Sequence, residues 1–360
     1  MDCCAPAVSR DQAATDERPW SSRPVLTRRQ LLRGMVLTAG AAGLAACGIR
    51  PGSDGDESLE AVSLAFCGQL LCVVPYEVTR AAGYFADEGL DVELIYSRGG
   101  SDAVQALNGG AVDFAASSFD AQLGAVAGGA TVKRFMTTGR LPLFALATAP
   151  DTAGEITGIG DLAGRHVAIS GPGNADETIL KFVLNREGVD PDSLEFATIG
   201  TNLYDALRLG QVDAGMVQEP ALSMLLEDGG RELVNFMEID DAEEVFGGAY
   251  EFMGVAVRDG EQEERADQLQ AMARAMRRGL EHVRTGDVGD IIDALPSELI
   301  TGEDLEQLTD IIERYRESLW PADVELDEDA AQRVVSSLLE AGALEREVSL
   351  DEALDTGVLA

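Results

Sequence analysis

The sequence predicts an α/β protein made of two similar lobes, and two observations carry this prediction. The first is an internal repeat, because residues 100–113 recur as residues 200–213. The second is the pattern inside each copy: a Gly and a hydroxyl residue precede a short apolar-periodic run, a Gly ends it, and Val-Asp leads into another apolar run. These signals indicate an N-cap, a helix, a C-cap and a strand. Two such units favour two lobes with a binding cleft between them.

Identical residues align the two copies. The pairs are Ala106 with Ala206, Leu107 with Leu207, Gly110 with Gly210, Val112 with Val212, and Asp113 with Asp213. The similarity extends backwards, since residues 89–94 before the first copy resemble residues 188–190 and 194–196 before the second. Each copy is therefore predicted to be a strand-helix-strand-helix-strand unit. The alternative is chance recurrence of alanine-rich helices with Gly caps.

The composition is strongly acidic. The chain of 360 residues has 64 acidic and 27 basic residues, a net charge of −37, and its only lysines are Lys133 and Lys181. Such a surface repels nucleic acid and anionic lipid, so neither is an expected partner. An acid-rich, lysine-poor composition is typical of proteins from high-salt organisms. We interpret the acidity as adaptation to habitat rather than as a binding device.

Residues 1–46 have the order of an export signal. Arg28 and Arg29 precede an uncharged Gly/Ala/Leu run at residues 34–46, and the run ends in Leu-Ala-Ala before Cys47. This resembles a twin-arginine signal followed by a lipobox, in which the cysteine is acylated. We expect Cys47 to be the lipidated N-terminus, held to the membrane by a flexible tether at residues 47–58. The alternative is a disordered leader followed by a short buried helix.

Two cysteines remain in the exported body of the chain. Cys3 and Cys4 leave with the signal, whereas Cys67 and Cys72 lie close together in an oxidising compartment. Either a disulfide or two buried thiols fits this spacing. His166 and His282 are far apart and match no zinc motif, so no metal site and no cofactor is predicted.

The predicted elements follow the two units in order. In the first lobe we expect strands at 59–66, 92–96, 114–117, 132–136 and 143–148, and helices at 76–85, after Pro75, and at 119–127, besides the repeat helix. In the second lobe we expect strands at 166–170, 194–199 and 214–217 and a helix at 175–186. A strand at 250–257 returns to the first lobe, and helices follow at 266–284, 289–295, 302–319 and 327–341.

The sequence carries no recognisable catalytic set. It has no nucleophile elbow, no HExxH and no P-loop. Residues 171–173 weakly resemble a phosphate-binding loop but lack its lysine. We interpret His166, on an apolar strand, and His282, on a charged helix, as structural.

Binding features are better supported. Loops at the carboxyl ends of the strands lead into helix N-termini, which favour anions, and Arg98 adds a positive charge. Ser101 and Thr201 start equivalent helices, so these two N-termini are expected to converge across the cleft. Glu219 could instead accept a hydrogen bond from an amine on the ligand. The alternative for each of these residues is a solvent-exposed residue that caps its own helix. The candidate ligand-binding residues are Gln69, Tyr76, Arg98, Gly100, Ser101, Ser117, Ser118, Asn174, Thr201, Asn202 and Glu219.

Several segments carry a family resemblance. They are residues 75–94 (PYEVTRAAGYFADEGLDVEL), the repeat ending in VDFAAS, residues 162–190 (LAGRHVAISGPGNADETILKFVLNREGVD), VDAGMVQEP, and the late helical tail with Trp320. Together they resemble the nitrate/sulfonate/taurine-type substrate-binding proteins of ABC importers, a family that also binds thiamine pyrimidine precursors. The similarity covers residues 60–360.

The resemblance implies the type 2 periplasmic-binding fold, in which each lobe is a mixed sheet flanked by helices and two segments cross between the lobes. The crossings are expected near Thr148 and Gly254, which gives a first lobe at 59–148, a second at 149–249, and a return to the first with C-terminal helices at 250–360. The loop from Cys67 to Cys72 and the acidic first turns of the helices match no single ligand of the family.

The resemblance also implies the function. We expect a monomeric, lipid-anchored, extracytoplasmic protein that captures a small organic or oxyanionic solute and delivers it to an ABC permease with its ATPase. The alternatives are a thiamine pyrimidine precursor binding protein, a pyrimidine-synthesis enzyme on the same fold, and a ligand-sensing partner of a receptor kinase. The enzyme needs a reactive His in the cleft and a cysteine-rich loop, for which Cys67 and Cys72 are a poor substitute, and export argues against it further.

Overall fold

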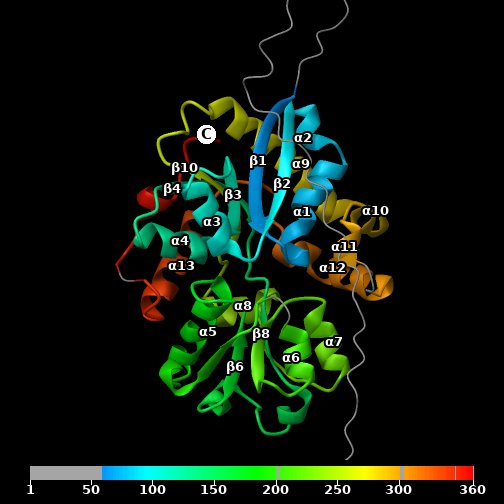
Figure 1. Cartoon of the computed structure of the whole chain (residues 1–360), viewed down its shortest axis with the longest axis vertical. Coiled ribbons are helices and arrows are strands. Elements are labelled where there is room, and N and C mark those ends of the chain that lie inside the picture. The colour runs from blue at the N-terminus through cyan, green and yellow to red at the C-terminus, as the bar shows by residue number, and fades with distance from the viewer. Residues whose placement is uncertain (1–58, 201–202, 301–303, 345, 360) are drawn as a thin grey trace, which may run out of the picture. The chain divides into compact units, whose positions relative to one another are not determined.

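Two five-stranded sheets organise the fold (Figure 1). The computed structural model describes residues 59–200, 203–300, 304–344 and 346–359, so the predicted export signal, the predicted tether with Cys47, Thr201 and Asn202 lie outside the described residues. The first sheet has the order β2-β1-β3-β10-β4 and the second has the order β7-β6-β8-β5-β9. The strands are β1 (Glu60–Cys67), β2 (Leu90–Ser97), β3 (Phe114–Ser118), β4 (Val132–Gly139), β5 (Ala145–Thr148), β6 (His166–Ile169), β7 (Glu195–Thr198), β8 (Ala214–Val217), β9 (Glu232–Asn235) and β10 (Met253–Arg258).

Both sheets have the same mixed topology. In the first, β1 pairs in parallel with β2 and β3, and β10 runs antiparallel between β3 and β4. In the second, β6 pairs in parallel with β7 and β8, and β5 runs antiparallel between β8 and β9. The predicted fold class, two mixed sheets flanked by helices, is confirmed.

The helices follow the strands as the repeat requires. We call the first sheet with α1 to α4 the first lobe, and the second sheet with α5 to α8 the second lobe. The helices are α1 (Leu70–Ala81), α2 (Tyr84–Asp87), α3 (Gly100–Asn108), α4 (Phe119–Ala127), α5 (Ala175–Arg186), α6 (Leu203–Arg208), α7 (Ala221–Glu227), α8 (Ile239–Phe246), α9 (Ala266–Thr285), α10 (Val288–Asp293), α11 (Ser297–Ile300), α12 (Leu305–Leu319), α13 (Glu328–Glu340) and α14 (Leu350–Ala353). Within the described residues, no helix is long and apolar enough to cross a membrane.

The aligned residues of the repeat do equivalent work in the two lobes. Gly110 and Gly210 have positive φ angles of 72° and 63°, a conformation that favours glycine at the end of a helix. Asp113 accepts hydrogen bonds from the backbone N–H and Oγ of Ser63 on β1, at 2.9 and 2.8 Å. Asp213 accepts one from the backbone N–H of His166 on β6, at 2.9 Å. In both lobes, therefore, the aspartate fixes a new strand beside the first strand of its parallel set.

Two boundaries expected from the sequence are wrong. The segment Ala145–Thr148 is β5 of the second sheet, so the chain leaves the first sheet after Gly139 and not near Thr148. A short apolar strand looks the same whichever sheet it joins, because pairing is a long-range property. In addition, α1 begins at Leu70 and contains Pro75, whereas the sequence predicted a start at Pro75. The apolar run before Pro75 is too short to show a helical period.

The C-terminal helices contact both lobes. α9 packs against α1 and α2 of the first lobe (Figure 1), and α13 contacts α4 and α5. On α12, the Tyr315 hydroxyl accepts from Asn235 Nδ2 at 3.0 Å and lies 3.3 Å from Glu219 Oε1, to which it donates. The C-terminal helices therefore pack against elements of both lobes.

A fully buried arginine ties the first sheet to the segment that returns from the second lobe. Arg134 on β4 donates to Glu251 Oε1 at 3.0 Å, to the carbonyl of Phe252 at 2.9 Å and to that of Ser117 at 2.7 Å. Its guanidinium also lies over the ring of Phe119, 4.8 Å from the centroid. Burial lowers the pKa of Arg134 and raises the pKa of Glu251, so each needs the other to remain charged.

We expect Arg134→Met to lower the free energy of unfolding by about 3 to 5 kcal/mol, because it leaves the Glu251 carboxylate buried without its partner. The double variant Arg134→Met/Glu251→Met should recover part of that loss, since no charge then remains buried. Denaturant unfolding measures all three. Arg274→Ala is the matched control, because it removes an exposed arginine paired with Glu88 and should cost less than about 1 kcal/mol. Equal losses for Arg134→Met and the control would contradict this account.

Candidate functional site

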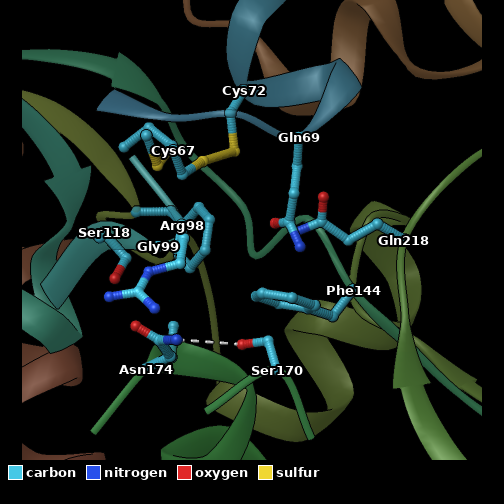
Figure 2. A pocket seen from close by; sticks show the side chains of 14 residues that line it. Cys67, Gln69, Cys72, Arg98, Gly99, Ser118, Phe144, Ser170, Asn174 and Gln218 are labelled. Carbon is cyan, nitrogen blue, oxygen red and sulfur yellow. Dashed lines mark hydrogen bonds between the residues drawn. A yellow bond between two sulfur atoms is a disulfide. The ribbon is translucent and has the colours of Figure 1, made fainter. Parts of the chain in front are cut away.

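A small cavity lies where the two lobes meet. Its volume is about 30 Å³, room for one or two water-sized groups. An open groove of about 800 Å³ adjoins it, and Arg98, Gly99, Ser170 and Asn174 line both spaces. Figure 2 shows the cavity. Its walls are Cys67, Gln69, Cys72, Arg98, Gly99, Gly100, Ser118 and Met253 from the first lobe, Ser170, Asn174, Ala175 and Gln218 from the second lobe, and Phe144 and Phe252 from the two connections between the lobes.

Four helix N-termini converge on this cavity. Gln69, Gly99, Ser118 and Asn174 are the N-cap residues of α1, α3, α4 and α5, and all of them lie in the wall. The arrangement follows from the topology, because each parallel strand ends at the same sheet edge and a helix starts there. First-turn N–H groups and the helix dipoles make this edge favourable for an anion or a strong hydrogen-bond acceptor.

The electrostatic character of the wall differs from that of the whole chain. Among the residues that the structure describes, Arg98 is the one charged side chain on the cavity, and no Asp or Glu lines it. The Arg98 side chain is 95% exposed and donates to Asp102 at 3.2 Å. The rest of the wall offers amides, hydroxyls and apolar groups. A chain with a net charge of −37 thus keeps carboxylates off the described surface of this cavity.

Gln218 is a wall residue with an unused acceptor. It follows β8, is 8% exposed, and its Oε1 has no hydrogen-bond partner within the described part of the chain. Figure 2 shows its amide and that of Gln69 both turned into the cavity. A buried amide oxygen without a partner is costly, so a bound molecule or water is expected to donate to it.

Comparison with known proteins agrees with this architecture. The sequence profile of the family described as NMT1/THI5 like matches residues 73–285, more than half of the chain. The chain belongs to the NMT1/THI5-like family. This confirms the family predicted from the sequence. No curated protein sequence matches the chain.

Solved structures show the same fold. A protein from Bordetella bronchiseptica RB50 is 26% identical, with a TM-score of 0.75 over 84% of this chain and 96% of its own. The alkanesulfonate-binding protein SsuA from Xanthomonas axonopodis pv. citri, bound to MOPS, is 16% identical, with a TM-score of 0.64 over 82% of this chain and 98% of its own. The periplasmic nitrate-binding protein NrtA from Synechocystis PCC 6803 is 12% identical, with a TM-score of 0.68 over 83% of this chain and 87% of its own. The periplasmic-binding fold is therefore confirmed.

In this NMT1/THI5-like chain, the structure brings together part of the predicted site. Gln69, Arg98, Gly100, Ser118 and Asn174 line the cavity. Ser101 lies in the adjoining groove. Thr201 and Asn202 fall outside the described residues, so the expected convergence of Ser101 and Thr201 stays a prediction.

Three predicted residues are not on the cavity wall. Tyr76 is buried and hydrogen-bonded to Thr138 Oγ1 at 2.8 Å, because α1 starts early and its second turn faces the core. Ser117 is the strand neighbour of Ser118, so its side chain points to the opposite face. Glu219, next to Gln218 in the turn after β8, does not line the cavity.

Glu219 has internal partners instead. Its Oε2 accepts from the backbone N–H of Ser223 at 3.0 Å, and its Oε1 from the Tyr315 hydroxyl. It fixes the start of α7 against α12.

The sequence missed wall residues of two kinds. Phe144 and Phe252 lie beside the crossing connections, and no local pattern links those segments to a site. Ser170 and Gln218 directly follow β6 and β8, and their position at a predicted strand end was the available signal. Within the described residues, no group of three His, Cys, Asp or Glu side chains could hold a metal ion.

Cys67 and Cys72 are joined by a disulfide in the structure, which selects one of the two alternatives that the sequence left open. The bond links the end of β1 to the first turn of α1, with Gln69 between them. It therefore restrains the N-terminus of α1 at the cavity wall.

Two buried carboxyl groups lie behind the wall. Asp120, on α4, accepts from the Tyr250 hydroxyl at 2.7 Å and from Thr178 Oγ1, on α5 of the second lobe, at 3.3 Å. Asp176, on α5, accepts from the backbone N–H of Ser170 and from its Oγ, at 2.7 Å for the latter. Burial raises the pKa of each carboxyl to about 6.

The Asp120 carboxyl should make stability depend on pH. The folded chain binds its proton up to about pH 6, whereas an unfolded Asp loses it near 3.8. The contribution of Asp120 to the free energy of unfolding is therefore fully present below about pH 4 and is lost as the pH rises through 6. We expect Asp120→Asn to be no more stable than the parent at pH 4. Between pH 4 and about pH 7 the stability of the variant relative to the parent should rise steadily. Thermal unfolding across pH 4 to 8 measures this, and a difference that does not change with pH would refute it.

Proposed function

We propose that the protein is the solute-binding component of an ABC importer, anchored by lipid outside the cytoplasmic membrane, and that its solute is a small organic anion or oxyanion. The observation that carries this proposal is the convergence of four helix N-termini and Arg98 on a cavity whose described wall has no carboxylate. The named structural neighbours, an alkanesulfonate-binding and a nitrate-binding protein, support the same class of solute.

The dimensions of the site suggest how the solute is held. The cavity, at about 30 Å³, admits only a small polar group, whereas the adjoining groove is far larger. A solute with more atoms requires the lobes to separate, and the connections at residues 140–144 and 247–252 are where the chain passes between them. Closure around the solute would then give the permease and its ATPase a distinct shape to recognise.

The enzymatic alternative finds less support. Pyrimidine synthesis needs a reactive histidine in the cleft, and neither histidine lines the described cavity. His166 pairs with Glu195 at 3.0 Å, and Nδ1 of His282, on α9, lies 3.2 Å from the hydroxyl of Tyr84, on α2. Both histidines therefore lie away from the cavity.

The charge on Arg98 supplies a direct test with methanesulfonate and nitrate as probes. We expect Arg98→Gln to weaken methanesulfonate binding by about 1 to 1.5 kcal/mol, at the lower end for a charge-assisted hydrogen bond because the side chain is exposed. Asp102→Asn should strengthen binding, since it frees the guanidinium. Calorimetry at one fixed salt concentration measures both, because salt screens the interaction.

Arg80→Gln is the matched control, as Arg80 pairs with Glu77 away from the cavity. If Arg98→Gln and the control bind both probes like the parent, the anion is not held here.

The lipid anchor has its own test. Cys47→Ala should release the protein from the membrane fraction, or leave the export signal uncleaved, because the acylated sulfur is lost. Fractionation with intact-mass analysis distinguishes the two. The proposal fails if the parent protein stays with the membrane while its Cys47 reacts as a free thiol.

A further inference from the structure

The two lobes make a direct contact at the outer side of the cavity. Ser101, on the first turn of α3, donates from Oγ to the carbonyl of Gly173 at 2.9 Å. Its backbone N–H points to the side-chain Oδ1 of Asn174, at 3.5 Å. Gly173 and Asn174 belong to the loop before α5, so these hydrogen bonds join the first lobe to the second.

A relay of hydrogen bonds determines which atom of the Asn174 amide faces α3. The Asp176 carboxylate accepts the hydroxyl hydrogen of Ser170 at 2.7 Å. Ser170 Oγ is then an acceptor for Asn174 Nδ2, at 3.1 Å, a bond drawn in Figure 2. Because the amide nitrogen of Asn174 donates to Ser170, the amide oxygen faces Ser101.

Gly99 makes room for this amide. A Cβ atom at Gly99 would lie 2.8 Å from Asn174 Nδ2 and 2.9 Å from its Oδ1, closer than such atoms approach. Gly99 and Asn174 line both the small cavity and the large groove. The Asn174 amide is therefore part of the partition between the two spaces.

We propose that Asn174 is an internal competitor for the solute. Its carbonyl oxygen occupies the N-terminus of α3, the position that an oxygen of an anionic solute would take, and it holds the lobes together while it does so. The contact at 3.5 Å is long for a hydrogen bond, so a charged oxygen at normal distance replaces it favourably. This inference rests on the proposed function, because it assigns Asn174 a role in setting the affinity for an anion.

The consequence concerns both affinity and rate. Before the anion reaches the α3 N–H, the Asn174 carbonyl has to leave it, so part of the interaction energy of the anion is spent on the exchange. Removing the competitor should then improve binding, which is the opposite of what the loss of an ordinary ligand contact does.

The test compares Asn174→Ala and Asn174→Asp with the parent, using methanesulfonate as the probe. We expect Asn174→Ala to bind it about threefold to tenfold more tightly and to associate faster. Asn174→Asp should bind it at least tenfold more weakly, because a carboxylate holds the helix N-terminus more strongly and repels the anion. Without probe, Asn174→Ala should show a larger radius of gyration in small-angle scattering than the parent. Calorimetry and stopped-flow kinetics supply the other measurements.

Asn108→Ala is the matched control. The Oδ1 of Asn108 also accepts a backbone N–H, that of Thr131 at 3.0 Å, but lies away from the cavity, so this variant should behave like the parent. Weaker binding by Asn174→Ala, with an unchanged radius of gyration, would overturn the inference and make Asn174 an ordinary ligand contact. If the parent binds no anionic probe, the proposed function fails, while the scattering comparison still decides whether Asn174 holds the lobes together.

Discussion

One geometric constraint shapes this molecule: a helix that follows a parallel strand begins at the carboxyl end of that strand. Both lobes contain a parallel set of three strands, so both collect helix N-termini along one edge. The N-caps of α1, α3, α4 and α5 then meet without any dedicated binding motif. The cavity obtains its preference for acceptor groups from the backbone, and side chains such as Gln69 and Gln218 only refine it.

Those parts of the fold that rest on local chemistry could be predicted from the sequence. The repeat predicts the strand-helix units because its identical positions have local roles. The glycines at 110 and 210 adopt positive φ angles, and the aspartates at 113 and 213 accept from backbone N–H groups. Pairing across the chain could not be predicted, so the strand expected at 143–148 in the first lobe is β5 of the second sheet.

The candidate site was predictable to the level of the loop but not of the side chain. Along a strand, successive side chains point to opposite faces. This alternation separates Ser117 from Ser118 on β3, and in the turn after β8 the cavity is lined by Gln218 and not by the expected Glu219. Aromatic wall residues such as Phe144 come from the connections between the lobes and have no sequence signature. The sequence therefore predicts which edge of the sheet carries the site, whereas which side chains face the cavity depends on how the two lobes pack.

The position of β10 has a consequence for the order of folding. The second sheet uses only β5 to β9, residues 145–235, an unbroken stretch of chain. The first sheet requires β10, residues 253–258, between β3 and β4, so its two halves remain unjoined until the second sheet has been synthesised. The portion made first is thus completed last, and the chain carries exposed strand edges through most of its synthesis. In a nascent protein of this topology, β3 and β4 can pair with other chains until β10 emerges, about a hundred residues before the C-terminus.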